Sequence, residues 1–170
     1  MIVRWIGAAM IVMGCGGVGF SMAAQYGKEL KMMRQLEDML TFMTCELEYK
    51  MTPLPQLLKN GAASMNGSLK GVILAFAEEL EENTWVNAPA CLAKVLKGVT
   101  ALPGRVNNVL REMSACLGVF DLPGQISTLQ ALKDRCHREV SSMEENRAQQ
   151  TRSYQTLGLC AGAALAVLFV

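Results

Sequence analysis

The sequence of 170 residues contains one histidine, His137. With a single imidazole, a cysteine or serine nucleophile has almost no base available, and His137 with the adjacent Cys136 falls short of a tetrahedral zinc set. The chain also lacks the GxxxxGK[ST] loop with which the commonest ATP- and GTP-binding proteins hold phosphates. We therefore expect no catalytic residue, metal or cofactor. We expect Cys136 to be packed inside and His137 to be exposed.

Charge is missing from both ends of the chain. No charged residue occurs from Trp5 to Gly27 or from Ser153 to Val170. All fifteen acidic residues, and every one of the sixteen basic residues except Arg4, lie between these segments. The middle of the chain is neutral and lacks the basic surface through which proteins bind nucleic-acid phosphates. This charge distribution argues against a nucleic-acid partner.

The first uncharged segment, residues 1–27, is long enough to span a membrane. About 20 apolar residues cross the hydrocarbon core, and Trp5–Ala24 meets that length. The alternative is a cleaved signal peptide, with Arg4 as its positive region and Ser21-Met22-Ala23 as a small-x-small cleavage site. Gly19 and Ala23, four residues apart, would let another helix pack closely, although glycine is also simply common in membrane helices.

The second uncharged segment, residues 153–170, is shorter. Its apolar part, Leu157–Val170, would be about 21 Å long as a helix, so it spans only if Ser153–Thr156 enter the interface or the bilayer thins. Gly158 and Gly162 form a GxxxG match, which is weak evidence for packing against the first segment. Whether these segments also form a homo-oligomer stays open at this point.

The basic residues beside the two segments indicate an orientation. Lys28 and Lys31 follow the first segment, Arg147 and Arg152 precede the second, and only Arg4 lies on the far side. Because basic flanks remain in the cytoplasm, the middle domain is predicted to be cytoplasmic and both termini outside. The predicted plan is an N-terminal transmembrane segment, a cytoplasmic helical bundle and a C-terminal transmembrane segment, at residues 1–27, 28–152 and 153–170.

The middle of the chain has helical periodicity throughout, and no stretch alternates as a strand does. The fold class is therefore all-α, with about six helices in the bundle. Thr52 is predicted to cap a helix that has Pro53 at its first position, and Ser68 and Asn87 to start two more. Gly118 is a predicted C-terminal cap. Predicted apolar stripes include Met33, Leu36, Leu40, Met43 and Leu47 on the first helix and Leu92, Val95, Leu96 and Val99 on the fourth.

The last helix is predicted to begin at Asp121. Pro123 and Gly124, which follow directly, are expected to delay or kink it.

Three groups of side chains allow a structural and a functional interpretation. The first is an acidic cluster, either a solvated face or a partner-binding surface, made of Glu78, Glu79, Glu81 and Glu82. The second is a set of methionines that fill the core or line an adaptable groove, Met32, Met33, Met39 and Met43. The third is the remaining middle cysteines, Cys45, Cys91 and Cys116, which are structural or nucleophilic, and the structural interpretation is favoured.

Two short sequences carry a family resemblance. The first is Glu46-Leu47-Glu48-Tyr49-Lys50-Met51-Thr52-Pro53-Leu54, after the first long helix, and the second is Leu117-Gly118-Val119-Phe120-Asp121 followed by Gln125. With the order of segments, they resemble the stage III sporulation protein AB family of endospore-forming bacteria. The candidate interaction residues are Glu46, Tyr49, Thr52, Pro53, Leu54, Leu117, Gly118, Asp121 and Gln125.

The first motif has two physical interpretations. Thr52 and Pro53 break the helix, and the hydroxyl of Tyr49, three residues after Glu46, could tie the turn down. Capping alone explains the residues as a corner of the fold, so a corner is favoured over a docking site.

The resemblance implies a non-enzymatic component of the channel-like complex that links the mother cell to the forespore. Its implied partners are the sporulation AA secretion-type ATPase, other membrane components of that channel and membrane lipid, and the bundle is similar to the type II secretion platform protein F. The implied location is the membrane, with the middle domain on the mother-cell side. Alternatives are a regulatory membrane scaffold that binds a different cytoplasmic signalling partner and, more remotely, a membrane enzyme with cysteine chemistry.

Overall fold

The computed structural model describes the backbone of residues 2–50, 52–82, 87–99, 102–117 and 122–169, and the side chains of most residues from 21 to 149 within these ranges. These ranges contain six α-helices and no strand, so the all-α prediction is confirmed. The helices are α1 (Ile2–Tyr49), α2 (Leu54–Ala63), α3 (Ser68–Glu82), α4 (Ala88–Lys97), α5 (Gly104–Cys116) and α6 (Leu122–Phe169).

The chain forms two compact units, and the long helices α1 and α6 contribute to both. The terminal unit consists of Met1–Leu30 and Ser141–Val170, and the central unit of Lys31–Val140. Both long helices are continuous from the terminal unit into the central unit.

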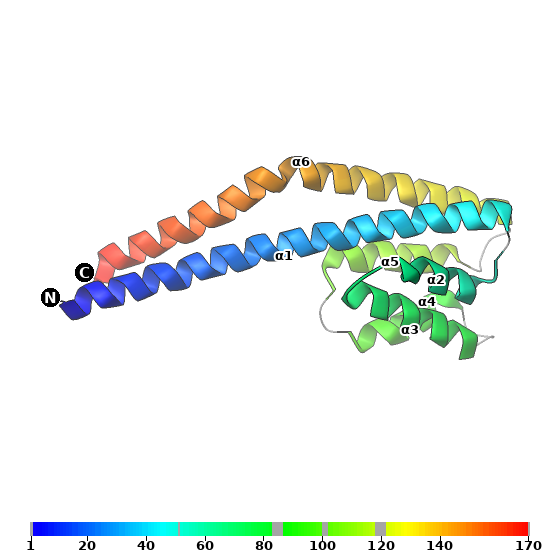
Figure 1. The fold of residues 1–170 in the computed structure, drawn as a ribbon, viewed down its shortest axis with the longest axis horizontal. Helices are drawn as coiled ribbons and strands as arrows, with labels where there is room; N and C mark the ends of the chain where they lie inside the picture. Colours follow the sequence, from blue (N-terminus) through cyan, green and yellow to red (C-terminus); the bar gives the residue numbers. More distant parts are fainter. Residues whose placement is uncertain (1, 51, 83–86, 100–101, 118–121, 170) are drawn as a thin grey trace. The chain divides into compact units, whose positions relative to one another are not determined.

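In the terminal unit, α1 and α6 lie side by side. The hydroxyl of Tyr26 on α1 donates a hydrogen bond of 3.0 Å to the main-chain oxygen of Met143 on α6. Leu30 and Met143 are buried. The two ends of the chain lie at the same end of this helix pair (Figure 1).

Within the described residues, no helix has both the length and the apolar character that crossing a bilayer requires. The predicted spans fall largely on positions whose side chains lie outside the described set, which are residues 1–20 and most of 154–170. Of the predicted packing residues in these spans, Ala23 is half-buried. The side chains of the others, Gly19, Gly158 and Gly162, lie outside the described residues, so their packing role stays a prediction.

The central unit buries the apolar stripe that the sequence predicts on α1. On α1 the side chains of Met33, Leu36, Leu40, Met43 and Leu47 are all at most 6% exposed. Four short helices, α2 to α5, gather beside this part of α1 (Figure 1). Met33, Met39 and Met43 are core residues, which confirms the core-filling interpretation of the methionines, while Met32 is half-buried.

The short helices pack in sequence order, α2 on α3, α3 on α4 and α4 on α5. Gly61 of α2 lies against α1, where a Cβ atom at this position would come within 3.3 Å of Cγ of Met39. A glycine therefore permits the close approach of the two helices. Gly67 precedes α3 with φ of 76°, a backbone conformation that favours glycine.

The helix starts only partly follow the sequence prediction. Asn87 caps α4 as predicted, since its Oδ1 accepts a 3.1 Å hydrogen bond from the main-chain N–H of Ala90. The predicted capping role of Thr52 is wrong: Pro53, with φ of −54° and ψ of 139°, is the capping residue of α2, and α2 begins one residue later than expected. α3 begins at Ser68 itself.

The start of α6 contains the two residues that the sequence singles out. α6 includes Pro123 as its second residue and continues as a helix through Gly124, because the first turn of a helix has no use for the missing N–H. α5 ends at Cys116 with Leu117 as the capping residue in an extended conformation. The predicted cap Gly118 and the predicted helix start Asp121 lie outside the described residues.

The fourth helix departs most from its predicted stripe. Leu92 is buried, but Val95, Leu96 and Val99 are only half-buried, while Ala88 and Cys91 are buried instead. Apolar surface therefore remains accessible at the C-terminal end of α4.

Candidate functional site

The first motif forms the corner between α1 and α2. The hydroxyl of Thr52 donates a 3.0 Å hydrogen bond to Oε2 of Glu46, and Nζ of Lys50 donates a 2.8 Å hydrogen bond to Oε1 of the same carboxylate. One carboxylate therefore holds both the last turn of α1 and the residue before Pro53. The corner interpretation of this motif follows directly from these contacts.

The electrostatics of the corner favour a charged Glu46. Hydrogen bonds from Lys50 and Thr52 lower the pKa of its carboxyl group below the usual range, because both bonds stabilise the carboxylate. The side chain of Glu46 is 14% exposed, whereas that of Lys50 is 69% exposed. Solvent screens such a pair, so its role is mainly to fix geometry.

Tyr49 does not tie the turn down, and that expectation is wrong. Tyr49 is 83% exposed, and the carboxylate of Glu46 is bound by Lys50 and Thr52 instead. The neighbouring Glu48 points to another element: its Oε1 accepts a 2.9 Å hydrogen bond from Nε2 of Gln130 on α6. An exposed aromatic ring thus stands on a corner that is held from two sides.

The second motif is described only in part. Leu117 is buried and Gln125 is half-buried, while Gly118 and Asp121 lie outside the described residues. No described hydrogen bond or ion pair joins Leu117 or Gln125 to the corner. In the first motif, Pro53 is exposed and Leu54 half-buried.

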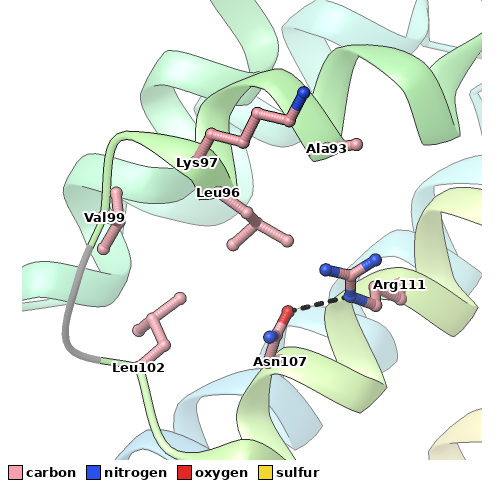
Figure 2. Close-up of a pocket in the computed structure, with 7 residues that line it drawn as sticks. All are labelled: Ala93, Leu96, Lys97, Val99, Leu102, Asn107 and Arg111. Carbon is pink, nitrogen blue, oxygen red and sulfur yellow. Dashed lines mark hydrogen bonds between the residues drawn. The ribbon is translucent and has the colours of Figure 1, made fainter.

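A groove lies between the C-terminal end of α4 and the start of α5 (Figure 2). Its volume is about 410 Å³, and its walls include Leu96, Lys97 and Val99 from α4 and the residues after it, and Leu102, Asn107 and Arg111 from α5 and the residues before it. Sequence reasoning missed this groove, because the apolar stripe of α4 predicted that Leu96 and Val99 would lie in the core.

The chain is similar to known proteins along nearly its whole length. The family model of stage III sporulation protein AB matches residues 4–170. The chain belongs to the stage III sporulation protein AB family. Stage III sporulation protein AB of Bacillus subtilis (strain 168) is 24% identical over an aligned length of 170 residues. The alignment covers 98% of this chain and 99% of that protein.

The stage III sporulation protein AB family also contains a solved structure with the same fold. That structure covers 72% of this chain and 98% of its own, with a TM-score of 0.62 and 20% identity. At this identity the similarity shows the fold alone. The match to the family model confirms the predicted resemblance, and the protein is a sporulation protein.

Three of the four cysteines in the central unit are buried. Cys91, Cys116 and Cys136 are buried, and burial raises the pKa of each thiol, that of Cys136 to about 12. His137 is 66% exposed, and its Nδ1 lies 2.6 Å from Oε1 of Glu37, so the imidazole is engaged with a carboxylate. The expectation of a packed Cys136 beside an exposed His137 is confirmed. Cys45 is exposed.

Two of the four residues of the acidic cluster on α3 form ion pairs within the fold, and the other two are exposed. Nζ of Lys94 lies 2.6 Å from Oε1 of Glu79, and Nζ of Lys59 lies 2.8 Å from both carboxylate oxygens of Glu81. Glu78 and Glu82 are exposed. Among the described residues, no group of three or more His, Cys, Asp or Glu side chains is arranged to hold a metal ion.

The sequence analysis did not predict two contacts at the corner. The ion pair of Lys50 with Glu46 could have been found from its four-residue spacing, which places the two side chains on one helix face. No sequence pattern indicates the hydrogen bond between Glu48 and Gln130, because these residues are 82 positions apart and only the packing of α6 brings them together.

Proposed function

We propose that this protein is a non-enzymatic, membrane-anchored scaffold of endospore formation whose central helices dock a secretion-type ATPase. The uncharged ends, 1–27 and 153–170, would anchor it in the membrane, with the middle of the chain in the cytoplasm on the mother-cell side. The other membrane components of the channel between mother cell and forespore, and membrane lipid, would be its further partners. Family membership supports the role in sporulation. The membrane anchor, the ATPase docking and the other partners are what the resemblance to the family implies.

The observation that carries the docking proposal is the exposed Tyr49 at the end of α1, near the hydrogen-bonded Glu46. Large aromatic side chains supply much of the binding energy at protein interfaces, and a rigid mounting reduces the entropy lost on binding. Glu46 fixes the corner through Thr52 and Lys50, and Gln130 fixes it through Glu48. The motif thus combines a structural corner with an accessible contact residue.

The burial of the thiols supports a role without thiol catalysis. A nucleophilic cysteine needs an accessible thiolate, and burial works against the thiolate of Cys91, Cys116 and Cys136. Replacing these three and Cys45 by serine or alanine should leave sporulation intact if the protein remains folded. Loss of sporulation in a folded, stable variant would favour the cysteine enzyme instead.

The docking test is co-purification of the full chain with the sporulation AA ATPase of the same organism. Tyr49→Ala should weaken the association by at least about tenfold, the scale of an aromatic contact at the centre of an interface. Tyr49→Phe, which keeps the ring, should bind nearly as well as the wild type. Arg138→Ala, an exposed change on α6, serves as the control.

Three outcomes distinguish the hypotheses. Loss of binding with Tyr49→Ala, at unchanged helicity and Tm, supports the corner as the docking site. Equal binding of Tyr49→Ala and the wild type would move the docking site elsewhere on the molecule. No association of the wild type with an active ATPase would favour the regulatory scaffold that binds a different signalling partner.

A further inference from the structure

The groove between α4 and α5 leaves apolar side chains incompletely covered. Leu96, Val99 and Leu102 line it and are half-buried. The periodicity of α4 assigns Leu96 and Val99 to a core-facing stripe, yet both side chains remain partly accessible. Apolar surface of this kind is a common feature of binding grooves that receive a helix from a partner.

The groove carries positive charge on both walls. Lys97 and Arg111 are exposed and lie on opposite sides of the opening, with Leu96 between them (Figure 2). Nε of Arg111 donates a 3.2 Å hydrogen bond to Oδ1 of Asn107, which is a neutral amide. No acidic side chain is among the described residues that line the groove. The charges are therefore available to an acidic ligand.

The start of α5 favours the same kind of ligand. Its capping residue Pro103 makes no side-chain hydrogen bond to the helix, and the first turn, which includes Asn107 of the groove wall, carries no acidic residue. The N–H groups at a helix start and the positive end of the helix dipole attract carboxylates. The apolar and charged walls and the helix start together fit an acidic, amphipathic helix.

This chain itself exposes such a helix surface. On α3, Glu78 and Glu82 are exposed and one turn apart, so they lie on one face, and Leu74 lies one turn before Glu78 on the same face and is half-buried. The other two acidic residues of the cluster are paired within the fold, with Lys94 and Lys59. Glu78 and Glu82 are thus the part of the cluster that a partner can reach.

We propose that the α4–α5 groove of one copy receives the acidic face of α3, carried by Glu78 and Glu82, from a second copy. Lys97 and Arg111 then pair with these carboxylates, and Leu74 adds to the apolar contact with Leu96 and Val99. Because the groove and the acidic face are different surfaces, the contact is head-to-tail. Repeated contacts of this kind form a ring or an open filament.

The test uses full-length protein in mild detergent and two variants that each reverse one surface. The groove variant is Lys97→Glu with Arg111→Glu, and the face variant is Glu78→Lys with Glu82→Lys. Sedimentation velocity should show association of the wild type that weakens with added salt. Each variant alone should associate at least about tenfold more weakly, because like charges then meet across the contact. Lys31→Glu with Arg138→Glu, at exposed sites outside both surfaces, is the control with the same charge change as the groove variant.

Mixing the two variants provides the decisive readout. In the mixture every groove again meets a face of opposite charge, so association should return, and a chain with all four reversals should associate by itself. This recovery also shows that the separate variants are folded. A monomeric wild type, undiminished association of both variants, or a mixture that fails to recover would overturn the proposal. A monomeric wild type whose groove binds a synthetic acidic helix would identify the occupant as another protein.

Discussion

The hydroxyl of Thr52 donates a 3.0 Å hydrogen bond to Oε2 of Glu46, across the break between α1 and α2. This bond replaces two contacts that the sequence suggested separately, a helix cap by Thr52 and a tether by Tyr49. Since Glu46 already holds Thr52 and Lys50, the ring of Tyr49 is left at the surface. The same bond therefore stabilises the corner and makes the tyrosine accessible.

Replacing Glu46 by glutamine should lower the Tm, and the effect should depend on pH. The pKa of Glu46 is lowered in the folded protein, so its carboxylate stabilises the fold above the unfolded pKa, and this contribution is lost as the pH falls through the folded pKa. The Tm difference from the wild type should thus be largest near pH 7 and shrink below about pH 4.3.

Circular dichroism melts of the full chain from pH 3 to pH 7 would measure this difference. Glu145→Gln, an exposed glutamate on α6, is the control and should leave the Tm unchanged at each pH. A Glu46→Gln difference that is the same at all pH values would show that the charge of the carboxylate is unimportant to the corner.

Removing the cap of α4 should destabilise the central unit. Asn87→Ala removes the acceptor for the main-chain N–H of Ala90 and should lower the free energy of unfolding by about 1 kcal/mol. Asn87→Ser and Asn87→Asp retain an acceptor and should stay close to the wild type. Denaturant unfolding measures the series, and equal stability of the alanine and serine variants would contradict a capping role.

Two glycines should respond in opposite directions to a larger side chain. Gly71 lies within α3 with nothing within 4 Å of an added Cβ, so Gly71→Ala should stabilise the protein by about 0.4–1 kcal/mol. Gly61 is buried against Met39, so Gly61→Val should destabilise it by about 1–3 kcal/mol. Thermal unfolding of both variants is the measurement. A neutral Gly61→Val would mean that α2 is free to shift away from α1.

The thiols should differ in reactivity in the folded protein. Cys45 is exposed, whereas Cys136 is buried, its Sγ lies 3.7 Å from the main-chain oxygen of Met33, and its pKa is raised to about 12. Iodoacetamide should label Cys45 readily near pH 7 and label Cys136 only after denaturation, as read by mass spectrometry of peptides. Labelling of Cys136 at the rate of Cys45 in folded protein would contradict the burial of this thiol.

Local patterns in the sequence were sufficient for the helices and most of the core. The stripe that includes Met33, Leu36 and Leu40 is buried because a helix places residues three and four apart on one face, whatever it packs against. The cap at Asn87 is equally local, since donor and acceptor are three residues apart. The family was also readable from the sequence, and the match to the family model confirms it.

The accessible surface depended on contacts between distant residues. Periodicity assigned Leu96 and Val99 to the core, but it contains no information on how far α5 lies from α4, and the structure leaves both side chains lining a groove. Likewise, the sequence suggested a helix cap by Thr52 and a tether by Tyr49, and only the structure showed that Thr52 binds Glu46. The sequence by itself determined the helices, the buried face of α1 and the family. Only the tertiary structure decided which side chains remain exposed, because exposure depends on where neighbouring helices stop covering one another.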